Sequence, residues 1–170
     1  PKANINENSK LNPIDNYAKN RLITEKFLEI KLKKKLINLR ISNIIGNRIF
    51  KNSRNTHKLF FDKFLNYKKK IKKKKIIVHN DFKDFLSIDQ FCRIISKIIE
   101  LNIYGTYNVS IAEIIYLSQI INWIDKKFLK KITLLEPTKN SFTLSNTKLI
   151  KKIRIKITKN QLKLFCKKLI

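Results

Sequence analysis

The chain has 170 residues, of which 43% are hydrophobic, and it carries a formal net charge of +27 at pH 7. This apolar content is enough to bury a core, so it excludes a globally disordered protein, and the length corresponds to one domain or part of a larger one. No stretch approaches the ~18 uncharged apolar residues of a membrane span, and no signal peptide opens the chain. We therefore expect a cytoplasmic protein without a membrane-spanning segment.

The excess of 39 Lys and Arg over 12 Asp and Glu has two explanations. A nucleic-acid partner is one, because lysines neutralise phosphates and release counterions. Codon bias is the other: Lys, Ile, Asn and Phe are abundant and have codons rich in A and T, whereas Gly and Pro are scarce. Only codon bias also explains the scarcity of glycine, so we attribute most of the charge to it. We interpret the run Lys68–Lys75 as a solvated loop, with a phosphate-binding or targeting patch as the alternative.

The cysteines and histidines predict no disulfide and no metal site. Cys92 and Cys166 lie on apolar, helix-like stretches, so we expect both to be reduced core residues. His57 and His79 are isolated, and no Cys/His spacing matches a zinc site.

Helical and strand-like segments alternate along the chain. Asp15 is predicted to cap a first helix that runs to about Lys33, with Ile23, Phe27 and Ile30 at helical spacing. Short apolar stretches predict strands at 36–41, 76–78, 105–109 and 131–135. Further helices are predicted at 57–70, 88–101, 112–124, 146–152 and 159–169. The inward face of the helix 88–101 is predicted to consist of Phe91, Ile94, Ile95, Ile98 and Ile99. This alternation predicts an α/β fold with a largely parallel sheet.

Four motifs in this order resemble a known family. They are Pro13-Ile-Asp-Asn-Tyr17-Ala-Lys-Asn-Arg21-Leu-Ile-Thr-Glu25, Leu39-Arg-Ile-Ser-Asn43-Ile-Ile-Gly46, Lys83-Asp84-Phe85-Leu-Ser-Ile88-Asp89-Gln90-Phe91 and Gly105-Thr-Tyr107-Asn108-Val109. Together they span about residues 5–125 and resemble the C-terminal portion of the extended short-chain dehydrogenase/reductase superfamily. Its members are nucleotide-sugar epimerases, dehydratases and ketoreductases.

The first motif places two functional groups one helical turn apart, because residues i and i+4 share a helix face. By resemblance, Tyr17 is the general acid/base that exchanges a proton with a sugar hydroxyl or carbonyl while a nicotinamide exchanges a hydride. Arg21 stands where the family has lysine, and it would hold the nicotinamide ribose and lower the pKa of the phenol. Arginine keeps the charge but cannot copy the hydrogen bonds of an ammonium group, so we expect weakened or altered activity. Glu25 is expected to be a helix-packing or interface residue.

The other motifs imply binding residues. Asn43, just past a predicted strand end, would lie near the nicotinamide and the sugar, although a turn-forming Asn before Gly46 explains it equally well. Lys83 stands where the family often has an arginine that reaches the diphosphate of the substrate, and it supplies the charge without the bidentate grip. Asp84 and Asp89 are predicted to cap and orient the following helix.

Two parts of the family pattern are absent from residues 1–170. The chain has two glycines and cannot supply the Gly-rich turn that seats a pyrophosphate, and the catalytic Ser or Thr would fall before Pro1. Met is absent as well, even at position 1. We therefore interpret the chain as a single incomplete domain whose N-terminal dinucleotide-binding half lies upstream. Its expected fold is the C-terminal part of a Rossmann-like, doubly wound, largely parallel sheet, plus a small substrate-binding α/β region.

By resemblance, the intact protein is an NAD- or NADP-dependent enzyme of polysaccharide biosynthesis that acts on a nucleotide-sugar in the cytoplasm and forms a homodimer. Two alternatives stay open. One is a basic nucleic-acid-binding protein, although the aromatic residues fall mostly on core-like positions and are not interleaved with the basic ones. The other is a degenerate, non-catalytic relative that keeps only a structural role.

Overall fold

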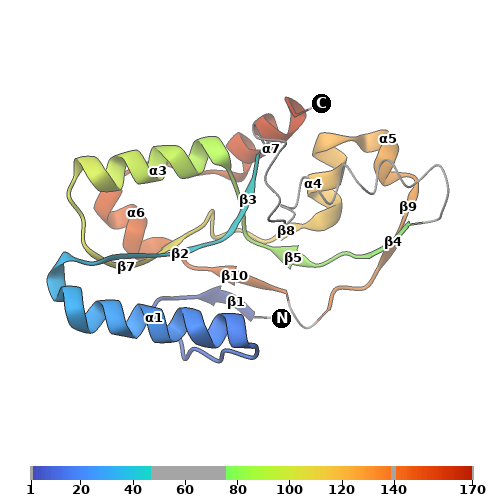
Figure 1. The fold of residues 1–170 in the computed structure, drawn as a ribbon. Coiled ribbons are helices and arrows are strands. Elements are labelled where there is room, and N and C mark those ends of the chain that lie inside the picture. The colour runs from blue at the N-terminus through green and yellow to red at the C-terminus, as the bar shows by residue number, and fades with distance from the viewer. Residues whose placement is uncertain (1, 47–75, 139–140, 170) are drawn as a thin grey trace, which may run out of the picture.

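The structure is a computed structural model that describes residues 2–46, 76–138 and 141–169. The predicted helix 57–70, His57 and the lysine run 68–75 lie outside the described residues. The described segments form a layer of short strands with helices on both sides (Figure 1).

The described strands form two-stranded pairs, most of them parallel. The parallel pairs join β1 (Lys2–Ile5) to β10 (Phe142–Leu144), β2 (Ile37–Ile41) to β7 (Gly105–Val109), β3 (Asn43–Ile45) to β6 (Phe85–Ser87) and β4 (Ile76–His79) to β9 (Ile132–Leu135). β5 (Phe82–Lys83) pairs antiparallel with β8 (Ile115–Tyr116). The prediction of an α/β fold with largely parallel pairing is confirmed, as are the four predicted strands, within one or two residues at their ends.

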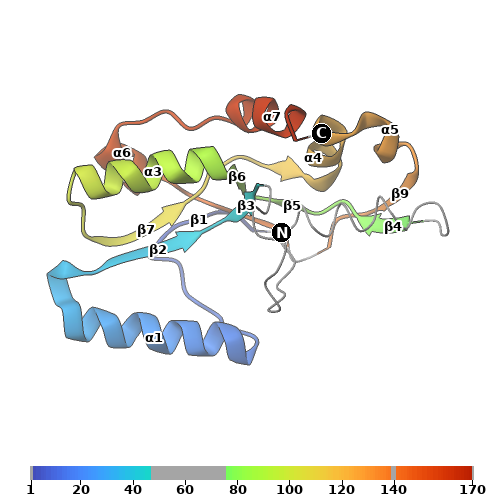
Figure 2. The same ribbon diagram turned by 45° about the horizontal axis from the view of Figure 1, so that its top comes forward.

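Helices lie on both sides of the β2–β7 pair. The helices of the described residues are α1 (Asn16–Leu32), followed by the 3-10 turn η1 (Lys33–Lys35), α3 (Ile88–Glu100), α4 (Leu117–Ile124), α5 (Lys126–Leu129), α6 (Thr147–Ile153) and α7 (Lys159–Lys167). α1 lies on one side of β2 and β7, and α3 and α6 lie on the other (Figure 2). The hydrophobic core lies on the side of α3, and no described residue of α1 is buried.

The inward face of α3 is mostly as predicted. Ile94 and Ile98 are buried, and Phe91 and Ile95 pack at the edge of the core. The prediction that Ile99 faces inward is wrong, since 70% of its surface is exposed. Each residue of a helix is rotated by 100° from the one before it, so Ile99 lies beyond the edge of the stripe that Ile94 and Ile98 define.

The helix predicted at 112–124 begins only at Leu117. Ala112 has a φ of 63°, outside the right-handed helical region, and Ile115 and Tyr116 pair with β5 instead. Tertiary contacts therefore override the local apolar pattern over the first five residues of this segment.

The two cysteines differ in exposure. Cys166 is buried, as predicted, and burial raises the pKa of its thiol to about 12. The prediction that Cys92 is a core residue is wrong, because Cys92 lies on the solvent side of α3, opposite Ile94 and Ile98. Both thiols are free.

No helix of the described segments has the length and apolar content that crossing a bilayer requires.

Candidate functional site

The first helix begins where the sequence predicts it. The carboxylate of Asp15 accepts the backbone N–H of Ala18 at 2.7 Å, which satisfies one of the free donors of the first turn. This N-cap places Tyr17 in the first turn of α1 and Arg21 one turn further along.

Tyr17 and Arg21 line one cavity of about 450 Å³ between α1 and β2. The guanidinium carbon of Arg21 lies 5.8 Å from the centre of the Tyr17 ring, within the range of a cation–π contact. Tyr17 is 69% exposed, so its hydroxyl is open to a ligand or to solvent. The other lining residues are Thr24, Glu25, Leu28, Asn38, Leu39, Arg40 and Ile41.

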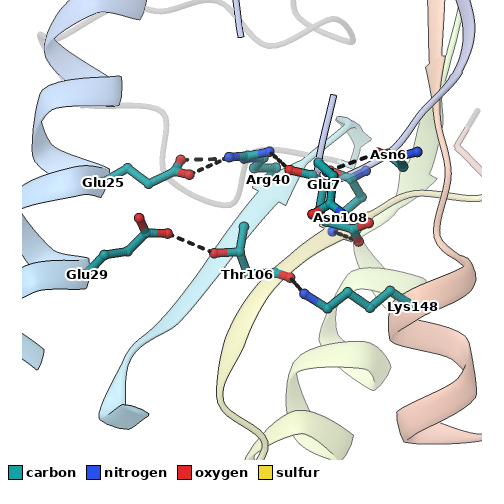
Figure 3. Close-up of polar contacts among 9 residues, drawn as sticks. Asn6, Glu7, Glu25, Glu29, Arg40, Thr106, Asn108 and Lys148 are labelled. Atoms are coloured by element: carbon teal, nitrogen blue, oxygen red, sulfur yellow. Dashed lines mark hydrogen bonds and ion pairs between the residues drawn. The ribbon is translucent and has the colours of Figure 1, made fainter. Parts of the chain in front are cut away.

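An ion pair ties the wall of this cavity on α1 to the wall on β2 (Figure 3). Arg40 approaches Glu25 side-on, with Nη2 2.5 Å from Oε1 and Nε 3.5 Å from Oε2. Partial burial acts to raise the pKa of Glu25, but the hydrogen bonds and the charge of Arg40 outweigh burial, so this pKa lies below its ordinary value. Glu25 is therefore an ionised, internally paired residue.

The segment before α1 is fastened to the same region. Arg40 donates through Nη1 to the backbone carbonyl of Glu7 at 3.0 Å, and the carboxylate of Glu7 accepts the backbone N–H of Asn108 at 2.9 Å (Figure 3). The amide of Asn108 donates to the carbonyls of Ile5 and Ser145 at 3.0 and 3.1 Å. These bonds hold the chain entry to α1 against β7 and the end of β10.

A second link joins α1 to β7. The hydroxyl of Thr106 donates to the carboxylate of Glu29 at 3.2 Å. The backbone carbonyl of Thr106 accepts from the ammonium group of Lys148 on α6 at 2.9 Å (Figure 3). Glu25 and Glu29 are four residues apart, so the face of α1 that holds them is turned toward the strands. Tyr17 and Arg21 lie on this same face.

Asn43 and Lys83 do not line this cavity. Asn43 lies just past the end of β2, as expected, and it opens the short strand β3, so the alternative of a turn-forming Asn is wrong. Its backbone N–H and its side-chain amide both donate to the carbonyl of Asp84, at 3.3 and 3.0 Å. Lys83 lies in β5 opposite Ile115. The structure thus brings Tyr17 and Arg21 together, and places Asn43 beside the β5–β6 junction.

Asp84 was predicted to cap the following helix, and this is wrong. Ser87 caps α3, since its hydroxyl accepts the N–H of Gln90 at 3.1 Å and the Gln90 side chain accepts the N–H of Ser87 at 3.0 Å. Asp89 lies in the first turn of α3, where a negative charge favours the helix.

The carboxylate of Asp84 instead joins distant segments. It is 1% exposed, and its Oδ1 accepts the N–H groups of Ile111 and Ala112 at 3.1 and 3.0 Å, while its Oδ2 accepts that of Leu144 at 2.7 Å. Burial raises its pKa to about 6, although the backbone donors act in the opposite direction. Asp84 is therefore a buried anchor between the β5–β6 junction, the loop after β7 and β10.

Sequence reasoning missed Arg40 and Glu7 as parts of this region. Arg40 belongs to the motif Leu39-Arg-Ile-Ser-Asn43, so its place in the pattern was a usable signal, but Glu7 carries no local signal. In the described ranges 2–46, 76–138 and 141–169, no three His, Cys, Asp or Glu side chains gather as a metal site would require.

Comparison with known proteins shows what the fold is. No protein-family model and no curated protein matches the sequence. The UDP-glucuronic acid 4-epimerase from Bacillus cereus, solved in complex with NAD, matches 98% of this chain and 55% of its own, with a TM-score of 0.74 and 17% identity. The UDP-N-acetylglucosamine 4-epimerase from Methanobrevibacter ruminantium, in complex with UDP-N-acetylmuramic acid, matches 95% and 54%, with a TM-score of 0.69 and 16% identity.

A dehydratase has the same fold. The dTDP-glucose 4,6-dehydratase from Bacillus anthracis, in complex with NAD, matches 92% of this chain and 52% of its own, with a TM-score of 0.69 and 14% identity. The chain thus spans about half the length of these structures. The prediction that it has the fold of the C-terminal part of Rossmann-like epimerases is confirmed.

Proposed function

We propose that the chain belongs to the extended short-chain dehydrogenase/reductase superfamily and is the C-terminal part of an NAD(P)-dependent nucleotide-sugar epimerase, dehydratase or ketoreductase. One observation carries the proposal: within this fold, a phenol and a guanidinium share one helix face and line one cavity beside β2. The fold alone does not carry it, because one fold hosts many activities.

Tyr17 is the proposed general acid/base. Its hydroxyl is exposed at the cavity, where a substrate oxygen comes within hydrogen-bond reach. Arg21 supplies a positive charge beside the ring of Tyr17, and its proposed role is to hydrogen-bond a ribose hydroxyl. A bound nicotinamide cofactor would supply the hydride transfer at a sugar carbon. Tyr17 and Arg21 fit the ribose end of such a cofactor, and the choice between NAD and NADP depends on residues outside this chain.

A nucleotide-sugar is the proposed substrate. Lys83 carries a positive charge on β5, suited to a diphosphate, and Asn43 presents an exposed amide nearby. The amide of Asn43 already donates to the carbonyl of Asp84, so its amide oxygen is the atom that we assign to the ligand.

The remainder of the active site, including the dinucleotide-binding half, is proposed to lie outside residues 1–170, as the length of the matching structures suggests. A homodimer in the cytoplasm is part of the same proposal. Ile23, Phe27 and Ile30 form an apolar stripe on α1 that is turned away from the cavity, and they are 65%, 55% and 72% exposed. Sedimentation of the whole protein tests the dimer. A variant that carries both Ile23→Glu and Phe27→Glu on α1 should sediment as a monomer.

The test of the catalytic proposal uses the whole protein that contains this chain, with NAD or NADP and a set of UDP- and dTDP-sugars. Tyr17→Phe should lower turnover by about 100-fold or more and leave nucleotide-sugar binding nearly unchanged, because general acid–base catalysis contributes on that scale. Tyr104→Phe is the matched control, since Tyr104 is exposed on the loop before β7 and does not line the cavity. Turnover that survives in Tyr17→Phe contradicts the assignment.

Arg21→Lys separates a working enzyme from a degenerate relative. If the site is catalytic, restoring the family's lysine should raise turnover, because an ammonium group fits the ribose hydroxyls better than the planar guanidinium. A protein that binds nucleotide-sugars but shows no turnover as either variant is a non-catalytic relative. Binding to RNA or DNA that weakens steeply with salt, without nucleotide-sugar binding, identifies the basic nucleic-acid-binding alternative.

A further inference from the structure

Arg21 lies midway between two side chains that compete for it. Tyr17 is four residues before it and Glu25 four residues after it, so all three lie along one face of α1. In an isolated helix, an arginine and a glutamate four residues apart form an ion pair. In this structure Arg21 lies over the ring of Tyr17, and Glu25 is engaged by Arg40 from the neighbouring strand.

Glu25 is the carboxylate that would draw Arg21 away if it were released. It is ionised, and its side chain is only 16% exposed, so it requires a cationic partner. The cations among the lining residues of the cavity are Arg21 and Arg40. The other carboxylates of this region are occupied elsewhere, Glu7 by the N–H of Asn108 and Glu29 by the hydroxyl of Thr106.

We propose that Arg40 is a positioning residue of the site: by holding the carboxylate of Glu25, it keeps the guanidinium of Arg21 over the ring of Tyr17. Arg40 is held in one orientation toward Glu25. Two of its nitrogens approach the carboxylate of Glu25 side-on, and the third donates to the backbone carbonyl of Glu7. The catalytic consequence rests on the function proposed above, whereas the contact itself is a property of this chain.

The contact can be measured by NMR on the chain labelled at arginine and tyrosine. In the native chain, the side-chain protons of Arg21 should show nuclear Overhauser effects to the ring of Tyr17 and an upfield ring-current shift. In Arg40→Met, both signals should fall to roughly half or less, because a helical ion pair and an exposed cation–π contact are comparable in strength and the released Glu25 is partly buried.

A double variant separates this role from a merely structural one. Arg40→Met with Glu25→Gln also lacks the ion pair, but it lacks the competing charge as well, so the contact between Arg21 and Tyr17 should return. A purely structural ion pair predicts no recovery. Signals that are unchanged in Arg40→Met, or that stay lost in the double variant, overturn the proposal.

Two further variants serve as controls. Glu25→Gln and Arg40→Lys should each keep the contact, since the first removes the competitor and the second still neutralises it. Circular dichroism establishes the folded fraction of each variant. If Arg40→Met does not fold, Arg40→Gln replaces it, because glutamine removes the charge and can still donate to the carbonyl of Glu7.

Activity of the whole protein then distinguishes the two proposals. If kcat falls in Arg40→Met and recovers in the double variant, both stand. If the contact responds as expected and neither the native enzyme nor Arg21→Lys turns over, the proposed function fails and the positioning role stands. If the native enzyme is active and the contact is indifferent to Arg40, the positioning role fails and the function stands.

Discussion

The buried carboxylate of Asp84 sets two physical effects against each other, and pH decides which is larger. Burial disfavours the charged form, whereas the three backbone N–H groups of Ile111, Ala112 and Leu144 favour it. The pKa of about 6, raised from an ordinary 3.8, means that burial prevails. Between these two values the folded chain holds a proton that the unfolded chain has released. The contribution of Asp84 to stability is therefore greatest below pH 4 and is lost as the pH rises through 6.

The magnitude follows from the size of the shift. A pKa of about 6 in the folded state and 3.8 in the unfolded state corresponds to a loss of about 2 kcal/mol in the free energy of unfolding between pH 4.5 and 7.5. Other carboxylates act in the opposite direction. The pKa values of Glu25 and Asp81 are lowered, so their contributions are lost as the pH falls. The total pH dependence therefore does not isolate Asp84, but a difference between two variants does.

Asp84→Asn provides that difference, because the amide does not titrate. Denaturant unfolding of the native chain and of Asp84→Asn at several pH values between 4.5 and 7.5 gives the free energy of unfolding of each. The native chain should lose about 2 kcal/mol relative to Asp84→Asn across this range. Ser110→Ala, which removes a buried hydroxyl that does not titrate in this range and donates to the carbonyl of Leu144, is the control and should run parallel to the native chain. A native chain that gains stability over Asp84→Asn as the pH rises would refute the reasoning, since the backbone donors would then outweigh burial.

Three other substitutions or labelling experiments follow from single contacts. Gly46→Ala should lower the free energy of unfolding by roughly 1–3 kcal/mol in denaturant titration, because the new Cβ would lie 3.1 Å from the side chain of Ile88; an unchanged stability would show that Ile88 shifts freely. Ala112→Gly should raise the free energy of unfolding by about 0.5–1 kcal/mol, since Ala112 has a φ of 63° that glycine adopts without strain. A lower free energy of unfolding would contradict this account. A thiol reagent on the native chain should label Cys92 rapidly and Cys166 only on unfolding, and two equally fast thiols would place Cys166 outside the core.

The elements that the sequence predicts correctly are those whose signal is local. Asp15 and the apolar spacing after it predict the start and length of α1, and the short β-branched stretches predict β2, β4, β7 and β9. In each case the residues that decide the structure are within a few positions of one another. The spacing of Tyr17 and Arg21 is a signal of this kind, so their common face is readable from the sequence.

The contacts that the sequence does not predict join residues far apart in the chain. Arg40 reaches Glu25 across 15 positions and Glu7 across 33, and Asp84 reaches Leu144 across 60. No periodicity records such pairs. The start of α4 was misplaced for the same reason, because Ala112 adopts its positive φ where its N–H meets the distant carboxylate of Asp84.

The few acidic residues of this basic chain are mostly engaged in contacts within the fold. Most described carboxylates bind a particular partner rather than pointing into solvent; those that accept a backbone N–H are Glu7, Asp15, Asp81, Asp84, Glu113 and Asp125. Glu25 and Glu29 bind Arg40 and Thr106. The described carboxylates therefore serve mainly to hold segments of the fold together, and most of the described basic side chains are left without an acidic partner.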